Sequence, residues 1–238
     1  MRTTIVNLNI GPDDLQGCHG IAKALGRLGA GEVRIVHFEE LRGATTPVDL
    51  GDALILGPQG TPFSAYDSDF LPWLHDLAEA WGGPILGICG GMQALTLAMG
   101  GTLGCVDGGG QAQGDQYGDR VKVSGPHAIT LTAEAWPSWL RQAAPDLRRD
   151  WQAEGGLAWE NHVEQPTAIV DALQTLASSA TTPIEAWAHR TRPWLASQFH
   201  PERGWGSGEA ETGCGAGRVW LQAWLQVVRA HPAAQAAR

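Results

Sequence analysis

The sequence predicts an α/β fold in which a mostly parallel central sheet is flanked by helices, with a smaller antiparallel strand section in the second half. Short apolar runs alternate with amphipathic segments through residues 1–100, which is the pattern of parallel strands joined by crossover helices. Strand-like runs return after residue 173 without helical segments between them. Ligands of such sheets bind beyond the carboxyl ends of the strands, so a site is expected in the loops that follow them.

The first half contains four short apolar runs bounded by turn residues, which predict strands at 4–9, 32–38, 52–56 and 84–88. Apolar residues at helical spacing predict helices at 13–28, 67–81 and 92–99. Gly29 and Gly31 are stop signals for the first helix. Pro72 is compatible with the second helix only near its first turn.

The second half begins with a polar, glycine-rich loop or hairpin region at 107–118. Further strands are predicted at 120–123, 129–132, 173–178, 184–188 and 194–199, and an amphipathic helix at 218–231. Residues 136–156 give no clear pattern. We expect most of the 11 Trp to pack in the core; the alternative is an aromatic partner surface formed by Trp136, Trp139 and Trp151. Residues 1–238 are expected to form a single domain.

The charge balance argues against several classes of partner. The chain has 16 basic and 25 acidic residues, a net charge of -9, and no basic stripe, so neither nucleic acid nor an anionic membrane is expected as main partner. No apolar run is long enough to span a bilayer, and the N-terminus has no signal-peptide pattern. The 4 Cys are scattered. We therefore expect a cytoplasmic protein whose thiols are reduced and mostly buried.

The segment 83–93, GPILGICGGMQ, is the most informative in the chain. A predicted strand runs into Gly87-x-Cys89-x-Gly91 and a helix follows, which is the nucleophile-elbow pattern with Cys in place of Ser. The helix N-terminus favours the reactive thiolate form of Cys89. The amide of Gly90 is expected to point to where an oxyanion would form. An inert buried cysteine is the alternative for this motif taken alone.

A second motif, FHPE at 199–202, comes at the end of the strand predicted for 194–199. His200 is thus also expected at a strand's carboxyl end, where it could take the thiol proton of Cys89. Glu202 could orient the imidazole and stabilise its charged form. A solvated turn is the alternative for an isolated His-Pro-Glu, but the upstream elbow favours a catalytic triad.

Together, the elbow and the FHPE motif resemble the class I (triad) glutamine amidotransferases, a family with a flavodoxin-like fold that hydrolyses the glutamine amide to glutamate and ammonia. The resemblance covers about residues 3 to 230, in the right order. It implies Cys89 as nucleophile, His200 as base and Glu202 as orienting acid. It also implies L-glutamine as substrate and no metal or organic cofactor.

The same resemblance implies an oxyanion hole built from two backbone amides. Gly90 would supply one of them. The loop GPQGTP at 57–62 resembles the family's glycine-rich loop, which supplies the other. Two alignments are possible, so the second donor is either Gly57 or Gly60.

Three further residues are implied as substrate contacts. Gln93 matches the family's Gln one turn after the Cys. His162 and Val163 lie in WENHV, which resembles a segment that often carries His-Ser beside bound glutamine. Here Val163 replaces the Ser, and a loop histidine without a direct role is the alternative for His162.

Two features depart from the family pattern. The elbow has CGGMQ where CLGxQ is usual, and the interval from Cys89 to His200, 111 residues, is long. The extra residues are expected in 105–156, where they could serve a partner or a specific substrate.

The expected function is the ammonia-producing half of a two-part enzyme, in which the ammonia passes to a separate synthase subunit. One alternative is a stand-alone γ-glutamyl amide hydrolase or transferase with the same triad; it would prefer a γ-glutamyl conjugate to glutamine. The other is a non-catalytic binding homologue, in which Cys89 would not be activated toward alkylation.

Overall fold

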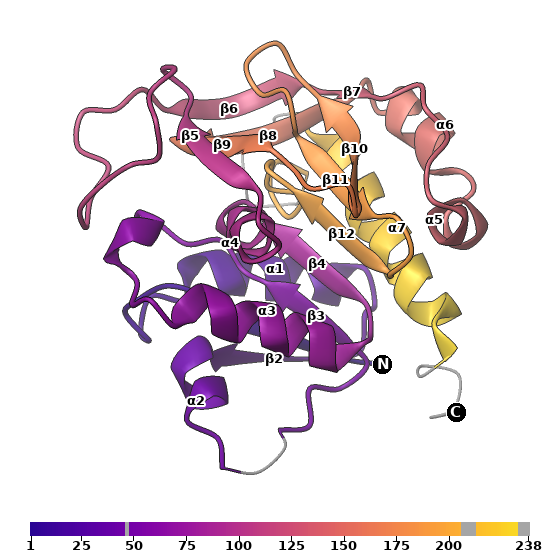
Figure 1. Ribbon diagram of the computed structural model, residues 1–238. Helices are drawn as coiled ribbons and strands as arrows, with labels where there is room; N and C mark the ends of the chain where they lie inside the picture. The colour runs from indigo at the N-terminus through magenta and orange to yellow at the C-terminus, as the bar shows by residue number, and fades with distance from the viewer. Residues whose placement is uncertain (46–47, 206–212, 233–238) are drawn as a thin grey trace.

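The computed structural model describes residues 1–45, 48–205 and 213–232. Within these residues, the central sheet has eight strands in the order β2-β1-β3-β4-β12-β11-β10-β7 (Figure 1). The parallel strands are β2 (Glu32–His37), β1 (Arg2–Asn7), β3 (Ala53–Leu56), β4 (Ile85–Ile88) and β12 (Trp194–Ser197). The antiparallel continuation consists of β11 (Ala186–His189), β10 (Leu173–Ser178) and β7 (Thr130–Leu131). Both parts of the predicted fold class are confirmed.

Helices cover both faces of this sheet (Figure 1). One face packs against α1 (Gln16–Arg27), α5 (Ser138–Ala143), α6 (Leu147–Ala153) and α7 (Gly215–Ala230). The other packs against α2 (Phe38–Arg42), η1 (Phe63–Ala65), α3 (Phe70–Trp81) and α4 (Gly90–Ala98). The two cores follow from the strand period of two: Ile5 lies in the first core and its neighbour Val6 in the second.

Helix α3 illustrates how local signals set an element. Phe70, Leu74 and Ala78 are spaced by four and are all buried, so one face of the helix packs on the sheet. Pro72 stands in the first turn, as its missing N–H requires. The helix ends at Gly82, whose φ of 65° is a left-handed conformation that favours glycine.

Two smaller antiparallel pairs complete the fold: β5 (Thr102–Cys105) with β9 (Glu164–Ala168), and β6 (Val123–Ala128) with β8 (Leu157–His162). The prediction of a strand at 120–123 was wrong, since β6 only begins at Val123. Gly125, with φ 98°, and Pro126 interrupt the apolar alternation that marks a strand. Strands β5, β8 and β9 were not predicted either, because Gly, Pro or polar residues interrupt the apolar alternation in them.

Most tryptophans are core residues. Trp187, Trp194, Trp220 and Trp224 are fully buried. Trp136 and Trp151 are also buried, so the alternative of an aromatic partner surface there was wrong. The 4 cysteines are buried, as was expected of most of them, and no disulfide forms within the described residues. In the ranges that the structure describes, no helix is long and apolar enough to cross a bilayer.

Candidate active site

The register of the parallel strands brings the predicted catalytic segments together. Ile88 at the end of β4 pairs with Ser197 at the end of β12, and the amide of Cys89 donates to the carbonyl of Ser197 at 2.7 Å. Leu56, the last residue of β3, pairs with Gly87. Three loops therefore start at one edge of the sheet, where the fold class predicts a site.

Cys89 stands on a strained elbow between β4 and α4. Its φ of 50° is, among the described residues, the only positive φ of a non-glycine residue. A Cβ at Gly91 would lie 2.0 Å from the Leu56 carbonyl oxygen, and one at Gly90 would lie 2.7 Å from the Gln59 amide nitrogen. Glycine at both positions lets β3 and its loop approach the elbow. The predicted nucleophile-elbow geometry is thus present, with the N-terminus of α4 behind the sulfur.

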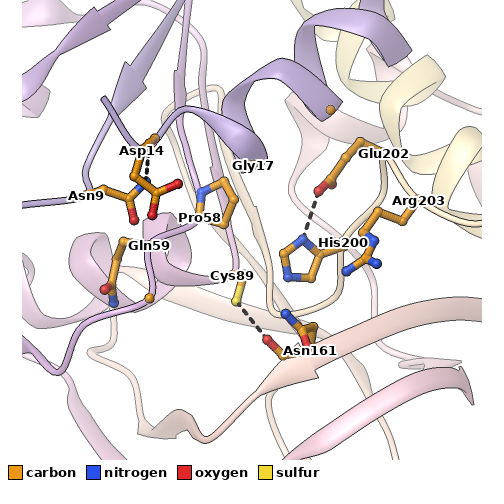
Figure 2. A pocket seen from close by; sticks show the side chains of 12 residues that line it. Asn9, Asp14, Gly17, Pro58, Gln59, Cys89, Asn161, His200, Glu202 and Arg203 are labelled. Atoms are coloured by element: carbon orange, nitrogen blue, oxygen red, sulfur yellow. Dashed lines mark hydrogen bonds and ion pairs between the residues drawn. The ribbon is translucent and has the colours of Figure 1, made fainter. Parts of the chain in front are cut away.

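His200 and Glu202 form a buried pair facing this elbow (Figure 2). The Nδ1 of His200 lies 2.8 Å from Oε1 of Glu202. Burial disfavours the imidazolium, but the charges of Glu202 and of Cys89 outweigh it and raise the pKa of His200 well above its ordinary value. Because Nδ1 is held by Glu202, Nε2 is the ring nitrogen that remains for a further partner.

A cavity of about 430 Å³ lies at this edge. Cys89, His200 and Glu202 line it together with Asn9, Asp14, Gly17, Gly20, Pro58, Gln59, Gly60, Asn161 and Arg203. Asn9, Asp14, Asn161 and Arg203 were not predicted as site residues. A signal existed for three of them: Asn9 ends a predicted strand, Asn161 lies in the WENHV segment, and Arg203 directly follows the FHPE motif. Figure 2 shows Cys89 between Gln59 and His200, with Asn161 below its sulfur.

The two candidate glycines for the second oxyanion donor differ in their surroundings. The Gly57 amide donates to the Val6 carbonyl at 3.0 Å and so belongs to the edge of the sheet. Gly60 lines the cavity. Within the described part of the chain, no hydrogen bond engages the backbone N–H of Gly60 or the backbone N–H of Gln59. Of the two, the Gln59 backbone nitrogen lies against the elbow, 2.7 Å from where a Cβ at Gly90 would be.

The three predicted substrate contacts lie outside the cavity lining. Gln93 and His162 are buried and both bind the backbone carbonyl of Glu164, at 2.5 Å from Gln93 Nε2 and 3.0 Å from His162 Nδ1. Val163 packs with Cys105 and Ala112. Contact of these three side chains with glutamine stays a prediction.

The segment 106–122, part of the region expected to hold the extra residues, borders the site. The Ser64 hydroxyl lies 3.1 Å from the carbonyl oxygens of Ala112 and Gly114. The buried Glu164 carboxylate accepts from the Ala112 amide at 2.7 Å and from the Tyr117 hydroxyl at 3.2 Å. Burial raises the pKa of Tyr117, so its phenol stays protonated and can donate to Glu164.

A second buried cluster of titratable groups lies behind the imidazole of His200, whose amide donates to the Trp159 carbonyl at 2.7 Å. Glu160 and Glu185 are both fully buried and near enough for each to shift the pKa of the other, and Glu160 Oε2 lies 3.2 Å from His162 Nε2. Burial raises the pKa of Glu160 to about 7; burial and the neighbouring Glu160 raise that of Glu185 to about 9. Burial lowers the pKa of His162 to about 4, so its ring is neutral.

This pair predicts that the free energy of unfolding falls as the pH rises from about 4.5 to about 9. The folded chain holds protons that the unfolded chain releases above the ordinary carboxyl pKa of 4.5, so the stabilisation is full below that pH and is lost as pH rises to about 9. Glu185→Gln should flatten this slope by up to about 1.4 kcal/mol per pH unit. Urea unfolding at several pH values measures it. The exposed Glu134→Gln is the control, and equal slopes in both variants would contradict a buried proton on Glu185.

The chain was compared with known proteins. The family model described as "Glutamine amidotransferase class-I" matches residues 17–212. The GMP synthase [glutamine-hydrolyzing] of Francisella tularensis is 29% identical over 143 residues, covering 60% of this chain and 23% of that protein. The Schizosaccharomyces pombe protein of the same name is 26% identical with the same coverage. The chain thus matches about a quarter of the length of these relatives.

Solved structures show the same fold. A glutamine amidotransferase from Thermotoga maritima superposes with a TM-score of 0.55 at 14% identity, covering 94% of this chain and 82% of that one. PurLQS from the same organism gives a TM-score of 0.61 at 16% identity, with 94% and 97% covered. On the strength of the family match over residues 17–212, this chain belongs to the class I glutamine amidotransferase family.

Proposed function

We propose that this chain hydrolyses the side-chain amide of glutamine through Cys89, His200 and Glu202 and supplies the ammonia to a synthase. The observation that carries the proposal is the 2.8 Å contact between His200 Nδ1 and Glu202 Oε1, beside a cysteine on a strained elbow in the same cavity. This contact fixes the ring so that Nε2 is left to serve the thiol.

In the first half of the reaction, the Cys89 sulfur bonds to the amide carbon of glutamine and the carbonyl oxygen becomes an oxyanion. The amide of Gly90 and an amide of the Gln59–Gly60 turn donate to it. The imidazolium of His200 gives its Nε2 proton to the leaving nitrogen as the C–N bond breaks. Ammonia leaves and a thioester remains. The raised pKa of His200 supports this step, because the ring begins the cycle protonated.

In the second half, His200 removes a proton from water, whose oxygen attacks the thioester carbon. The ring keeps this proton as imidazolium while the C–S bond breaks and the sulfur leaves as thiolate. The product acid then gives its remaining proton to solvent and departs as glutamate, which restores the thiolate and imidazolium pair. Glu202 stays ionised throughout and orients the ring.

The ammonia acceptor is proposed to be a synthase domain or a separate synthase chain. The relatives that support this are named GMP synthase [glutamine-hydrolyzing], and the match to them covers only 23% of their length.

Glutamate release from glutamine by the purified chain tests the proposal, together with labelling of Cys89 by a diazoketone analogue of glutamine. We expect Cys89→Ala to abolish both, whereas Cys105→Ala, which removes another buried thiol, should retain them. Turnover that survives in Cys89→Ala would refute the nucleophile. A higher kcat/KM for a γ-glutamyl amine than for glutamine would favour the stand-alone hydrolase instead.

A further inference from the structure

Gln198 connects the nucleophile to the rest of the buried polar network. It follows β12 directly, is fully buried, and its backbone amide donates to the Glu185 carbonyl at 2.7 Å. Its side-chain Nε2 donates to Cys89 Sγ at 3.6 Å, a hydrogen-bond distance for sulfur. The two residues are 109 positions apart in sequence, and the pairing of β12 with β4 places them side by side.

The direction of this hydrogen bond is fixed by its neighbours. The Glu164 backbone carbonyl can only accept, so the group that Gln93 presents to it at 2.5 Å must be the NH₂. The same nitrogen of Gln93 lies 3.2 Å from Oε1 of Gln198. Gln198 must therefore turn its oxygen to Gln93 and its NH₂ to the sulfur; the flipped amide would set two NH₂ groups against each other.

The sulfur thus has a different partner for each of its states. A protonated thiol can donate to the Asn161 carbonyl, 3.9 Å away, and a thiolate can accept from Gln198. Cys89 and Gln198 are both buried, so water cannot readily replace the donor. A neutral donor stabilises the anion without adding a charge that would compete with His200 for Glu202.

We propose that Gln198 is a catalytic residue that donates a hydrogen bond to the Cys89 thiolate, and that Gln93 is a positioning residue that orients the Gln198 amide. The inference rests on the proposed function for the identity of the nucleophile. The two residues then have different roles at the sulfur. His200 exchanges the proton of Cys89, and Gln198 stabilises and orients the resulting thiolate. The same arrangement also gives Gln93 a role that needs no contact with substrate.

The test measures the rate at which iodoacetamide alkylates Cys89 at a series of pH values, with mass spectrometry as the readout. This measurement does not depend on glutamine turnover. Gln198→Met removes the donor at similar volume, and Gln198→Asn keeps an amide but withdraws it from the sulfur. We expect either variant to slow alkylation at neutral pH by about tenfold and to move the midpoint of the pH profile upward. A merely structural role would leave that midpoint unchanged.

Gln174→Met is the matched control, since Gln174 is also buried and its Nε2 donates to a backbone carbonyl, that of Ala135, at 3.0 Å. It should alkylate like the wild type. A wild-type rate and midpoint in a folded Gln198→Met or Gln198→Asn would overturn the proposal. Gln198-dependent alkylation in a chain that releases no glutamate would support this inference and count against the proposed function instead.

Discussion

His200→Ala should lower kcat for glutamine hydrolysis by on the order of 10⁵-fold, while Glu202→Gln should cost less, on the order of 10³-fold to 10⁴-fold. His200 is the only triad member that moves protons in both halves of the proposed reaction. Removing it takes away the charged partner of the thiolate as well as the acid that protonates the leaving nitrogen. Glu202 acts through the ring, which it holds at 2.8 Å, so its loss leaves a misoriented base rather than none.

The comparison is made by steady-state glutamate release, with His75→Ala on the exposed face of α3 as a matched control for loss of an imidazole. The control should keep wild-type kcat. Equal losses in His200→Ala and Glu202→Gln, or a larger loss in the latter, would contradict the two roles.

Gly91→Ala is expected to be the most damaging single-methyl change in the fold. The new Cβ would lie 2.0 Å from the Leu56 carbonyl oxygen and 2.9 Å from the Leu56 Cβ. Neither of these atoms belongs to the flexible end of a side chain, so α4 and β3 must move apart. We expect a loss of about 3 kcal/mol in the free energy of unfolding, together with displacement of Cys89.

Urea unfolding measures this loss, and Gly110→Ala is the control. A Cβ at Gly110 meets nothing within 4 Å, so this substitution should change the free energy of unfolding little. A Gly91→Ala chain as stable as Gly110→Ala would show that the elbow can relax. The close approach of β3 to α4 would then not be the reason for glycine at position 91.

Local patterns predicted the strands of the central sheet well. Strand β10 begins and ends where it was predicted, at Leu173 and Ser178, because apolar residues and turn signals mark it without help from other segments. The prediction of α4 at 92–99 began two residues late, since glycine gives no helix signal at Gly90 and Gly91. The strands of the two smaller antiparallel pairs were not predicted with their bounds, because their pairing depends on distant partners: β5 pairs with β9.

The family and the elbow could be predicted from the order of residues alone, because the glycines and the cysteine that shape that turn are adjacent in the chain. The same holds for His200 and Glu202, whose separation of two residues sets their 2.8 Å contact. The side chains around the sulfur could not be predicted in this way. Gln198 reaches Cys89 across 109 residues, and Gln93 reaches Gln198 across 105. Such contacts depend on which strands lie next to each other and in what register, and no local pattern of residues encodes that.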